Sequence, residues 1–276
     1  LSNIVVAQKT FPNNGVKNTF EPIHAFTNAH IVWAPGQALP NANLLVQGDR
    51  ILSADSTTTI PAHAIIHDMD GDYIYPSFIE LHSEYGIPKK QRENWKPQPQ
   101  YRSNKSGAVA WNEAIHPEVE ARNLFKHNEK SAKKYRKAGF GAVLTHQQDG
   151  IARGSGILTT LASNSEHTTI LNGNSSAHYS FSKGSSRQKY PSSLMGSIAL
   201  LHQTYLDAEW YEQAPEGEYN LSLEAWNELQ DLPQFFEVSN KIDILRAWKI
   251  AEEFEIDYIF FGAGDEYQRV NEIAET

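Results

Sequence analysis

The sequence contains no cysteine among its 276 residues. This absence excludes a disulfide framework, a zinc site built on thiolates and a cysteine nucleophile. No Gly-x-Ser-x-Gly segment occurs either, so the nucleophile turn of many serine hydrolases is missing. A bound metal ion would therefore have to be held by the acidic residues and the 11 histidines.

Long basic stretches and long apolar runs are also absent. The formal net charge of -9 without a basic cluster disfavours binding to nucleic acid or to an anionic membrane surface. No apolar run approaches the roughly 20 residues that a membrane-spanning helix needs. With 40% hydrophobic residues, the chain can still bury a core. We expect a globular protein that binds small molecules, with no nucleic-acid partner and no membrane span.

The first residues can be interpreted in two ways. Residues 1–7 resemble the small-residue end of a secretory signal peptide, followed by a polar leader over residues 8–22. The alternative is that they form a short buried strand. The signal-peptide interpretation predicts an exported protein that is periplasmic or extracellular.

The stretch from Tyr73 to Gly86 organises the rest of the chain. It combines β-branched and aromatic residues with His82 and Glu84, which lie two residues apart. On a strand, both side chains point to the same face and lie about 6.6 Å apart along the backbone. If this strand lines a parallel barrel, its carboxyl end is where such folds place their chemistry. His82 and Glu84 are therefore candidate metal ligands.

The same stretch resembles the first barrel strand of the metal-dependent amidohydrolase superfamily. The similarity is to the imidazolonepropionase-like and dihydroorotase-like branches, in which this strand reads roughly Pro-Gly-Phe-Ile-Asp-x-His-x-His. The matching positions are Pro76, Phe78, Ile79 and His82. The positions that depart from the pattern are Ser77 for Gly, Glu80 for Asp, and Glu84 for the second metal-binding His.

The order of the patterns along the chain predicts an α/β protein. Short strands near the start give way after residue 116 to helices alternating with strands. The resemblance implies that residues 23–72 form the N-terminal part of a composite β-sandwich. It implies that residues 73–276 form the first part of a TIM-type (β/α)8 barrel. About five or six units are visible where a closed barrel has eight, so the chain is interpreted as an N-terminal fragment.

The resemblance also implies a hydrolytic site with one or two divalent ions. Such ions activate a water molecule and polarise the carbonyl group of an amide or cyclic amide. His82 falls at the first ligand position, Glu84 at the second, and Glu237 at the position of a histidine on a later strand. These three residues are candidate ligands for Zn, Mn or Mg. The alternative is that Lys or Arg pairs with both glutamates and that no metal is bound.

Three further residues are candidate substrate-binding groups. His146 follows a predicted strand, Arg153 lies in the glycine-rich run from Gly150 to Gly156, and His178 lies in a segment rich in Gly, Asn and Ser. The glycine-rich run either cradles a phosphate or carboxylate group or forms a flexible turn. His146 has the competing interpretation of a hydrogen-bonded loop residue.

These observations leave three hypotheses for the function. The first is an exported, metal-dependent hydrolase of carbon-nitrogen bonds in amides or cyclic amides. The second is a catalytically degenerate, metal-free amidohydrolase-fold domain. Such a domain would act as a scaffold or ligand-binding half, with the remainder of the polypeptide or a second amidohydrolase-like half as partner. The third is a carbohydrate- or peptide-binding module that uses the aromatic residues of a long loop, Trp95, Tyr101 and Trp111.

Overall fold

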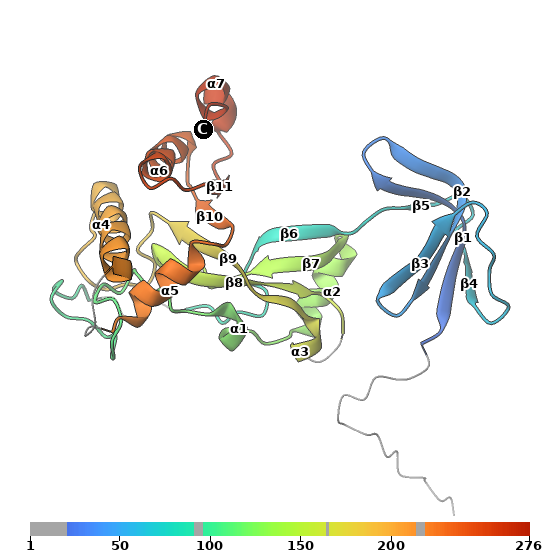
Figure 1. The fold of residues 1–276 in the computed structure, drawn as a ribbon, viewed down its shortest axis with the longest axis horizontal. Coiled ribbons are helices and arrows are strands. Elements are labelled where there is room, and N and C mark those ends of the chain that lie inside the picture. Colours follow the sequence, from blue (N-terminus) through green and yellow to red (C-terminus); the bar gives the residue numbers. More distant parts are fainter. Residues whose placement is uncertain (1–20, 91–95, 164–165, 214–218) are drawn as a thin grey trace, which may run out of the picture. The chain divides into compact units, whose positions relative to one another are not determined.

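The computed structural model describes residues 21–90, 96–163, 166–213 and 219–276. The described residues form two compact units, which divide between Pro76 and Ser77 (Figure 1). The expected signal-peptide tail at residues 1–7, most of the leader at 8–22, and Trp95 lie outside the described residues. No helix within the described ranges is long and apolar enough to cross a bilayer.

The first unit is built on one five-stranded sheet. Its strands are β1 (Ile23–Ala34), β2 (Gln37–Gln47), β3 (Arg50–Asp55), β4 (Ile65–Asp68) and β5 (Tyr73–Ile74). The order is β3-β2-β1-β4, and β5 also pairs with β1. Gly48 and Asp49 form a two-residue hairpin loop, across which Gln47 pairs with Arg50. Gly48 has a φ of 59°, which a residue without a Cβ adopts readily.

The second unit contains a curled six-stranded sheet that forms a half-barrel (Figure 1). Its strands are β6 (Phe78–Ser83), β7 (Phe140–Thr145), β8 (Ala152–Thr160), β9 (Ile170–Ser180), β10 (Gln234–Glu237) and β11 (Tyr258–Phe261). They lie side by side in sequence order. The strand β8 is antiparallel to both of its neighbours, β7 and β9. The other neighbouring pairs are parallel: β6 with β7, β9 with β10, and β10 with β11.

The structure corrects the interpretation of two glycine- and serine-rich segments. The run from Gly150 to Gly156, expected to be a turn or an anion cradle, leads into the buried strand β8, and the segment containing His178 is largely β9. The glycines of β8 allow close packing. A Cβ at Gly154 would collide with the carbonyl oxygen of Val119, and one at Gly156 would lie 2.6 Å from the His178 ring. Tertiary packing therefore explains these glycines better than chain flexibility does.

Helices lie between the strands of the half-barrel, and two short ones follow its last strand. They are α1 (Ala121–Leu124), α2 (Glu129–Lys137), α3 (Glu166–Thr169), α4 (Leu194–Gln213), α5 (Leu221–Leu229), α6 (Lys241–Glu253), the 3-10 helix η1 (Glu266–Arg269) and α7 (Val270–Ile273). Between His116 and Gly139 the chain forms two separate helices, α1 and α2. Asn128 caps α2 by accepting a hydrogen bond from the backbone of Ser131. Asn240 caps α6 in the same way, because its side chain accepts hydrogen bonds from the backbone of Ile242 and Asp243.

The largest hydrophobic core joins α4, α5 and α6 to the sheet. Its most deeply buried side chains include Leu201, Trp226, Phe236 and Ile250. Full burial of one such side chain contributes roughly 1.5–3 kcal/mol to folding. This packing fixes the positions at which β10 begins and ends.

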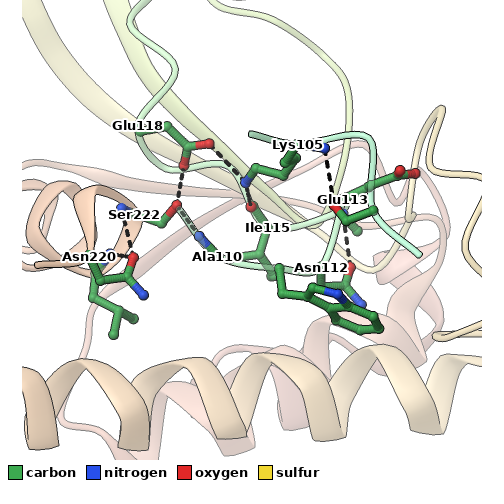
Figure 2. A network of polar contacts seen from close by, with 12 residues as sticks. Lys105, Ala110, Asn112, Glu113, Ile115, Glu118, Asn220 and Ser222 are labelled. Atoms are coloured by element: carbon green, nitrogen blue, oxygen red, sulfur yellow. Dashed lines mark hydrogen bonds and ion pairs between the residues drawn. The ribbon is translucent and has the colours of Figure 1, made fainter. Parts of the chain in front are cut away.

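Polar contacts hold the long segment between β6 and α1 (Figure 2). Lys105 forms an ion pair with Glu118 at 2.8 Å and donates a hydrogen bond to the carbonyl oxygen of Ile115 at 2.6 Å. Ser222, in the first turn of α5, donates to Glu118 and accepts from the backbone of Ala110, both at 2.7 Å. Burial lowers the pKa of Lys105, while the pairing with Glu118 opposes this effect. The described part of this segment is therefore docked on α5 without a helix or strand of its own.

Candidate functional site

One edge of the half-barrel collects most of the predicted site residues. His82 lies near the carboxyl end of β6, His146 directly follows β7, His178 lies near the carboxyl end of β9, and Glu237 ends β10. Because β8 runs antiparallel to its neighbours, its amino-terminal end reaches the same edge and brings Arg153 there. The structure thus gathers five of the six candidate residues, and the antiparallel strand explains the presence of an arginine among them.

Three imidazole rings form the centre of this cluster. The rings of His146 and His178 stack with centroids 3.5 Å apart and an angle of 6° between their planes. The His82 ring lies 5.2 Å from that of His146 and 4.1 Å from that of Phe261. The Nε2 atom of His178 is hydrogen-bonded to the hydroxyl of Ser176 at 2.7 Å. Both ring nitrogens of His146 are buried without a hydrogen-bond partner in the described part of the chain.

Burial keeps the three imidazoles neutral. It lowers the pKa of His146 and of His178 well below the ordinary value of 6.5, and the guanidinium of Arg153 lowers both further. The pKa of His82 is also lowered, mainly by burial, although the carboxylate of Glu237 opposes this shift. All three rings are therefore uncharged at pH 7, which is the form that tolerates a neighbouring guanidinium.

The two candidate carboxylate ligands are each paired with a cationic side chain. Glu237 forms an ion pair with Arg153 at 2.5 Å, and the Arg153 side chain is only 5% exposed. Arg153 also donates from Nε to the carbonyl oxygen of Gly150 at 3.1 Å. Glu84 forms an ion pair with Lys89 at 2.5 Å. The arrangement therefore places a permanent positive charge of the protein itself beside the three histidines.

As they lie, these residues do not fit a metal centre. No group of three or more His, Asp or Glu side chains in the described ranges is arranged to hold an ion. A zinc ion lies about 2.0–2.1 Å from a ligating imidazole nitrogen and close to the plane of the ring. The parallel rings of His146 and His178 lie 3.5 Å apart, so one ion cannot lie in both planes. Glu84 and Glu237 already have cationic partners.

A cavity of about 670 Å³ opens beside His82. Its lining includes His82, Glu84, Lys126 and Gln148, but not His146, Arg153 or His178. Sequence reasoning did not identify Gln148, whose Nε2 lies 2.8 Å from the Nε2 atom of His82. Its position shortly after a predicted strand could have marked Gln148 as a candidate site residue. The three expected substrate-binding residues are at most 4% exposed. They are therefore buried behind the residues that line the cavity and do not line it themselves.

The buried side chain of His116 should make the stability of the protein depend on pH. His116 is 4% exposed, and burial lowers its pKa from 6.5 to about 4. Protonation of His116 therefore favours the unfolded chain. The stability that the folded protein has while His116 is neutral is fully present above pH 6.5 and is lost as the pH falls towards 4. The expected loss is about 3 kcal/mol in the free energy of unfolding, measured by urea denaturation at pH 7 and pH 4. A His116→Gln variant should show a smaller loss, and a His63→Gln control at an exposed site should keep the full loss. Equal losses in His116→Gln and the wild type would contradict this assignment.

Sequence comparisons alone do not assign the chain to a family. No family model matches it, and no curated protein does. A solved structure shows a likeness in fold. An amidohydrolase from Thermotoga maritima superimposes with a TM-score of 0.67 at 19% identity, over 86% of this chain and 63% of that one. The two proteins share a fold.

Two other solved structures match this chain less closely. A prolidase in complex with N-methylphosphonate-L-proline matches with a TM-score of 0.36 at 13% identity, over 82% of this chain and 59% of that one. A D-hydantoinase from Thermus sp. matches with a TM-score of 0.33 at 11% identity, over 86% of this chain and 57% of that one. Both overlaps are too loose to support an argument. The chain spans less than two thirds of the length of each of these three proteins.

Proposed function

We propose that this is an amidohydrolase-like protein whose described half-barrel is a metal-free, ligand-binding half. The half-barrel would be the first part of a TIM-type barrel, and the five-stranded sheet would be part of the accompanying β-sandwich. The fold shared with an amidohydrolase and the first-strand pattern ending at His82 support the kinship. The observation that carries the metal-free assignment is the Arg153–Glu237 ion pair, in which a guanidinium neutralises the carboxylate expected to bind an ion.

In this proposal the cavity beside His82 receives a small molecule. His82 and Gln148 offer hydrogen-bonding groups, and Lys126 adds a positive charge at the rim. Either the remainder of the same polypeptide or a second amidohydrolase-like half would be the structural partner. We further propose that the protein is exported, which rests on the character of residues 1–7 alone.

Metal-dependent hydrolysis of amide or cyclic amide bonds is the second candidate. It is favoured by His146, which lies beside His82 and His178 and whose two ring nitrogens are buried without a hydrogen-bond partner among the described residues. Bound Zn, Mn or Mg would polarise the carbonyl group and activate a water molecule. His82, Glu84 and Glu237 would supply the ligands only if the glutamates left Lys89 and Arg153.

Metal analysis together with hydrolysis assays separates the two candidates. Elemental analysis of the purified protein should find far less than one divalent ion per chain. Chelation and a His82→Ala substitution should leave any hydrolysis of dihydroorotate, hydantoin or dipeptides unchanged. His63→Ala is the matched control at an exposed histidine. One ion per chain that is lost in His82→Ala together with hydrolysis would overturn the metal-free proposal and favour the metal-dependent one.

A further inference from the structure

The helix α4 has an apolar outer face. It lies at the periphery of the second unit (Figure 1), and one face packs on the core through the buried residues Ser197, Leu201, Thr204, Tyr205 and Ala208. The opposite face carries Met195, Leu206 and Trp210, which are 79%, 50% and 56% exposed. Ala199, on the same face, is also exposed. A surface helix normally has polar residues on its outer side, so these four residues mark a contact surface.

The four residues form one continuous stripe, which we call the outer stripe. At about 3.6 residues per turn, Met195, Ala199, Leu206 and Trp210 fall within about 60° of one another around the helix axis. From Met195 to Trp210 the stripe is about 22 Å long. It is therefore long enough to pack along a second helix over several turns.

The outer stripe has a two-fold pattern. Met195 lies as far before the midpoint between positions 202 and 203 as Trp210 lies after it. Ala199 and Leu206 are equally distant from the same midpoint. If two copies of α4 pack in antiparallel directions about this midpoint, Met195 faces Trp210 of the other copy, and the small Ala199 faces Leu206. A methionine sulfur beside an aromatic ring is a favourable contact. A two-fold interface uses one patch twice and needs this self-complementarity.

The charges of α4 favour the antiparallel direction. The helix contains no Lys or Arg, and its acidic residues, Asp207, Glu209 and Glu212, all lie in its carboxyl-terminal half. Its amino-terminal end carries the positive end of the helix dipole. Lys189 lies beside that end, because it lines a cavity together with Leu194. Parallel helices would bring two acidic ends together, whereas antiparallel helices bring each acidic end to the positive end of the other.

We propose that the protein forms a two-fold symmetric dimer in which the outer stripes of two copies pack against each other in antiparallel directions. The partner at this surface is a second copy of the chain. One pair of helices is a small interface, so the dimer dissociates on dilution in the micromolar range. The inference does not depend on the metal-free assignment, because the outer stripe contains no residue of the histidine cluster.

Sedimentation equilibrium of the intact chain tests the dimer. The wild type should show a monomer–dimer equilibrium that shifts to monomer on dilution. Trp210→Glu should raise the dissociation constant of the dimer at least about tenfold, because it removes the contact with Met195 twice and buries two unpaired carboxylates. Trp33→Glu is the matched control at a tryptophan that is 50% exposed in the first unit, and it should associate like the wild type. Circular dichroism should show that both variants are folded.

Introduced cysteines test the direction of packing, since the chain has none of its own. Mixing the variants Ala199→Cys and Leu206→Cys should give a disulfide-linked dimer under mild oxidation. Ala199→Cys alone should cross-link far more slowly. Its two thiols would lie about 10 Å apart along the helix axis, and a disulfide spans a Cα separation of at most about 7 Å.

Three results would overturn the proposal. The first is a wild type that stays monomeric at millimolar concentration, which would mean that the outer stripe serves a different protein. The second is an equal loss of association in Trp210→Glu and Trp33→Glu. The third is cross-linking of Ala199→Cys alone as fast as that of the mixture, which is the outcome expected for parallel helices.

Discussion

Replacing Gly154 with alanine should lower the free energy of unfolding of the second unit by about 2–5 kcal/mol. Gly154 has a φ of 81°, a conformation that costs an L-residue roughly 1–2 kcal/mol. The added Cβ would also collide with the carbonyl oxygen of Val119, which is backbone and cannot rotate away. Urea denaturation followed by tryptophan fluorescence measures the loss. Because Gly154 directly follows Arg153, the substitution also tests whether the packing of β8 holds the guanidinium in place.

Gly264→Ala provides the matched control for this prediction. Gly264 has a φ of 74° and lies in the same unit, but no atom lies within 4 Å of the position of an added Cβ. Its replacement should therefore cost only the roughly 1–2 kcal/mol of backbone strain. If the two variants lost equal stability, the close approach of Val119 to β8 would be wrong.

The parts of the fold that follow a regular local pattern could be predicted from the sequence. The helix α6 is an example, because an apolar stripe and the cap at Asn240 define it locally. A short strand was predicted at Thr168–Leu171, where β9 begins. The strand β8 and the rest of β9 were not predicted, because they are rich in Gly and Asn, which have low strand propensity. What makes these segments strands is burial between neighbours, with Gly156 leaving space for the His178 ring. This information lies in the packing and not in the segments themselves.

The candidate site was predictable in its location but not in its pairings. Parallel strands bring their carboxyl ends to one edge, so the approach of Glu237 to His82 follows from the strand pattern. The presence of Arg153 depends on the direction of β8, which the sequence did not reveal. The partner of Glu84 is Lys89 in the loop after β6, and nothing in the spacing selects this lysine over its neighbours.

The ion pair between the buried guanidinium of Arg153 and the partly exposed carboxylate of Glu237 gives the second large expected effect. Glu237→Leu should lower the free energy of unfolding by about 3 kcal/mol or more, because it leaves a buried guanidinium without its carboxylate. Arg153→Met should cost less, since the Glu237 side chain is 38% exposed and remains accessible to water. The double variant should be more stable than Glu237→Leu alone, because no uncompensated charge remains in it. Urea denaturation of the wild type and the three variants gives the coupling energy.

The same variants report on the neighbouring histidines. Arg153 lowers the pKa values of His82, His146 and His178, so Arg153→Met should raise all three, as measured by NMR titration. Glu237→Leu should act in the opposite direction on His82, whose pKa the carboxylate raises. A zero coupling energy together with unchanged histidine titrations would mean that the guanidinium does not neutralise Glu237. That carboxylate would then be free to bind a metal ion, and the metal-free assignment would lose the observation that carries it.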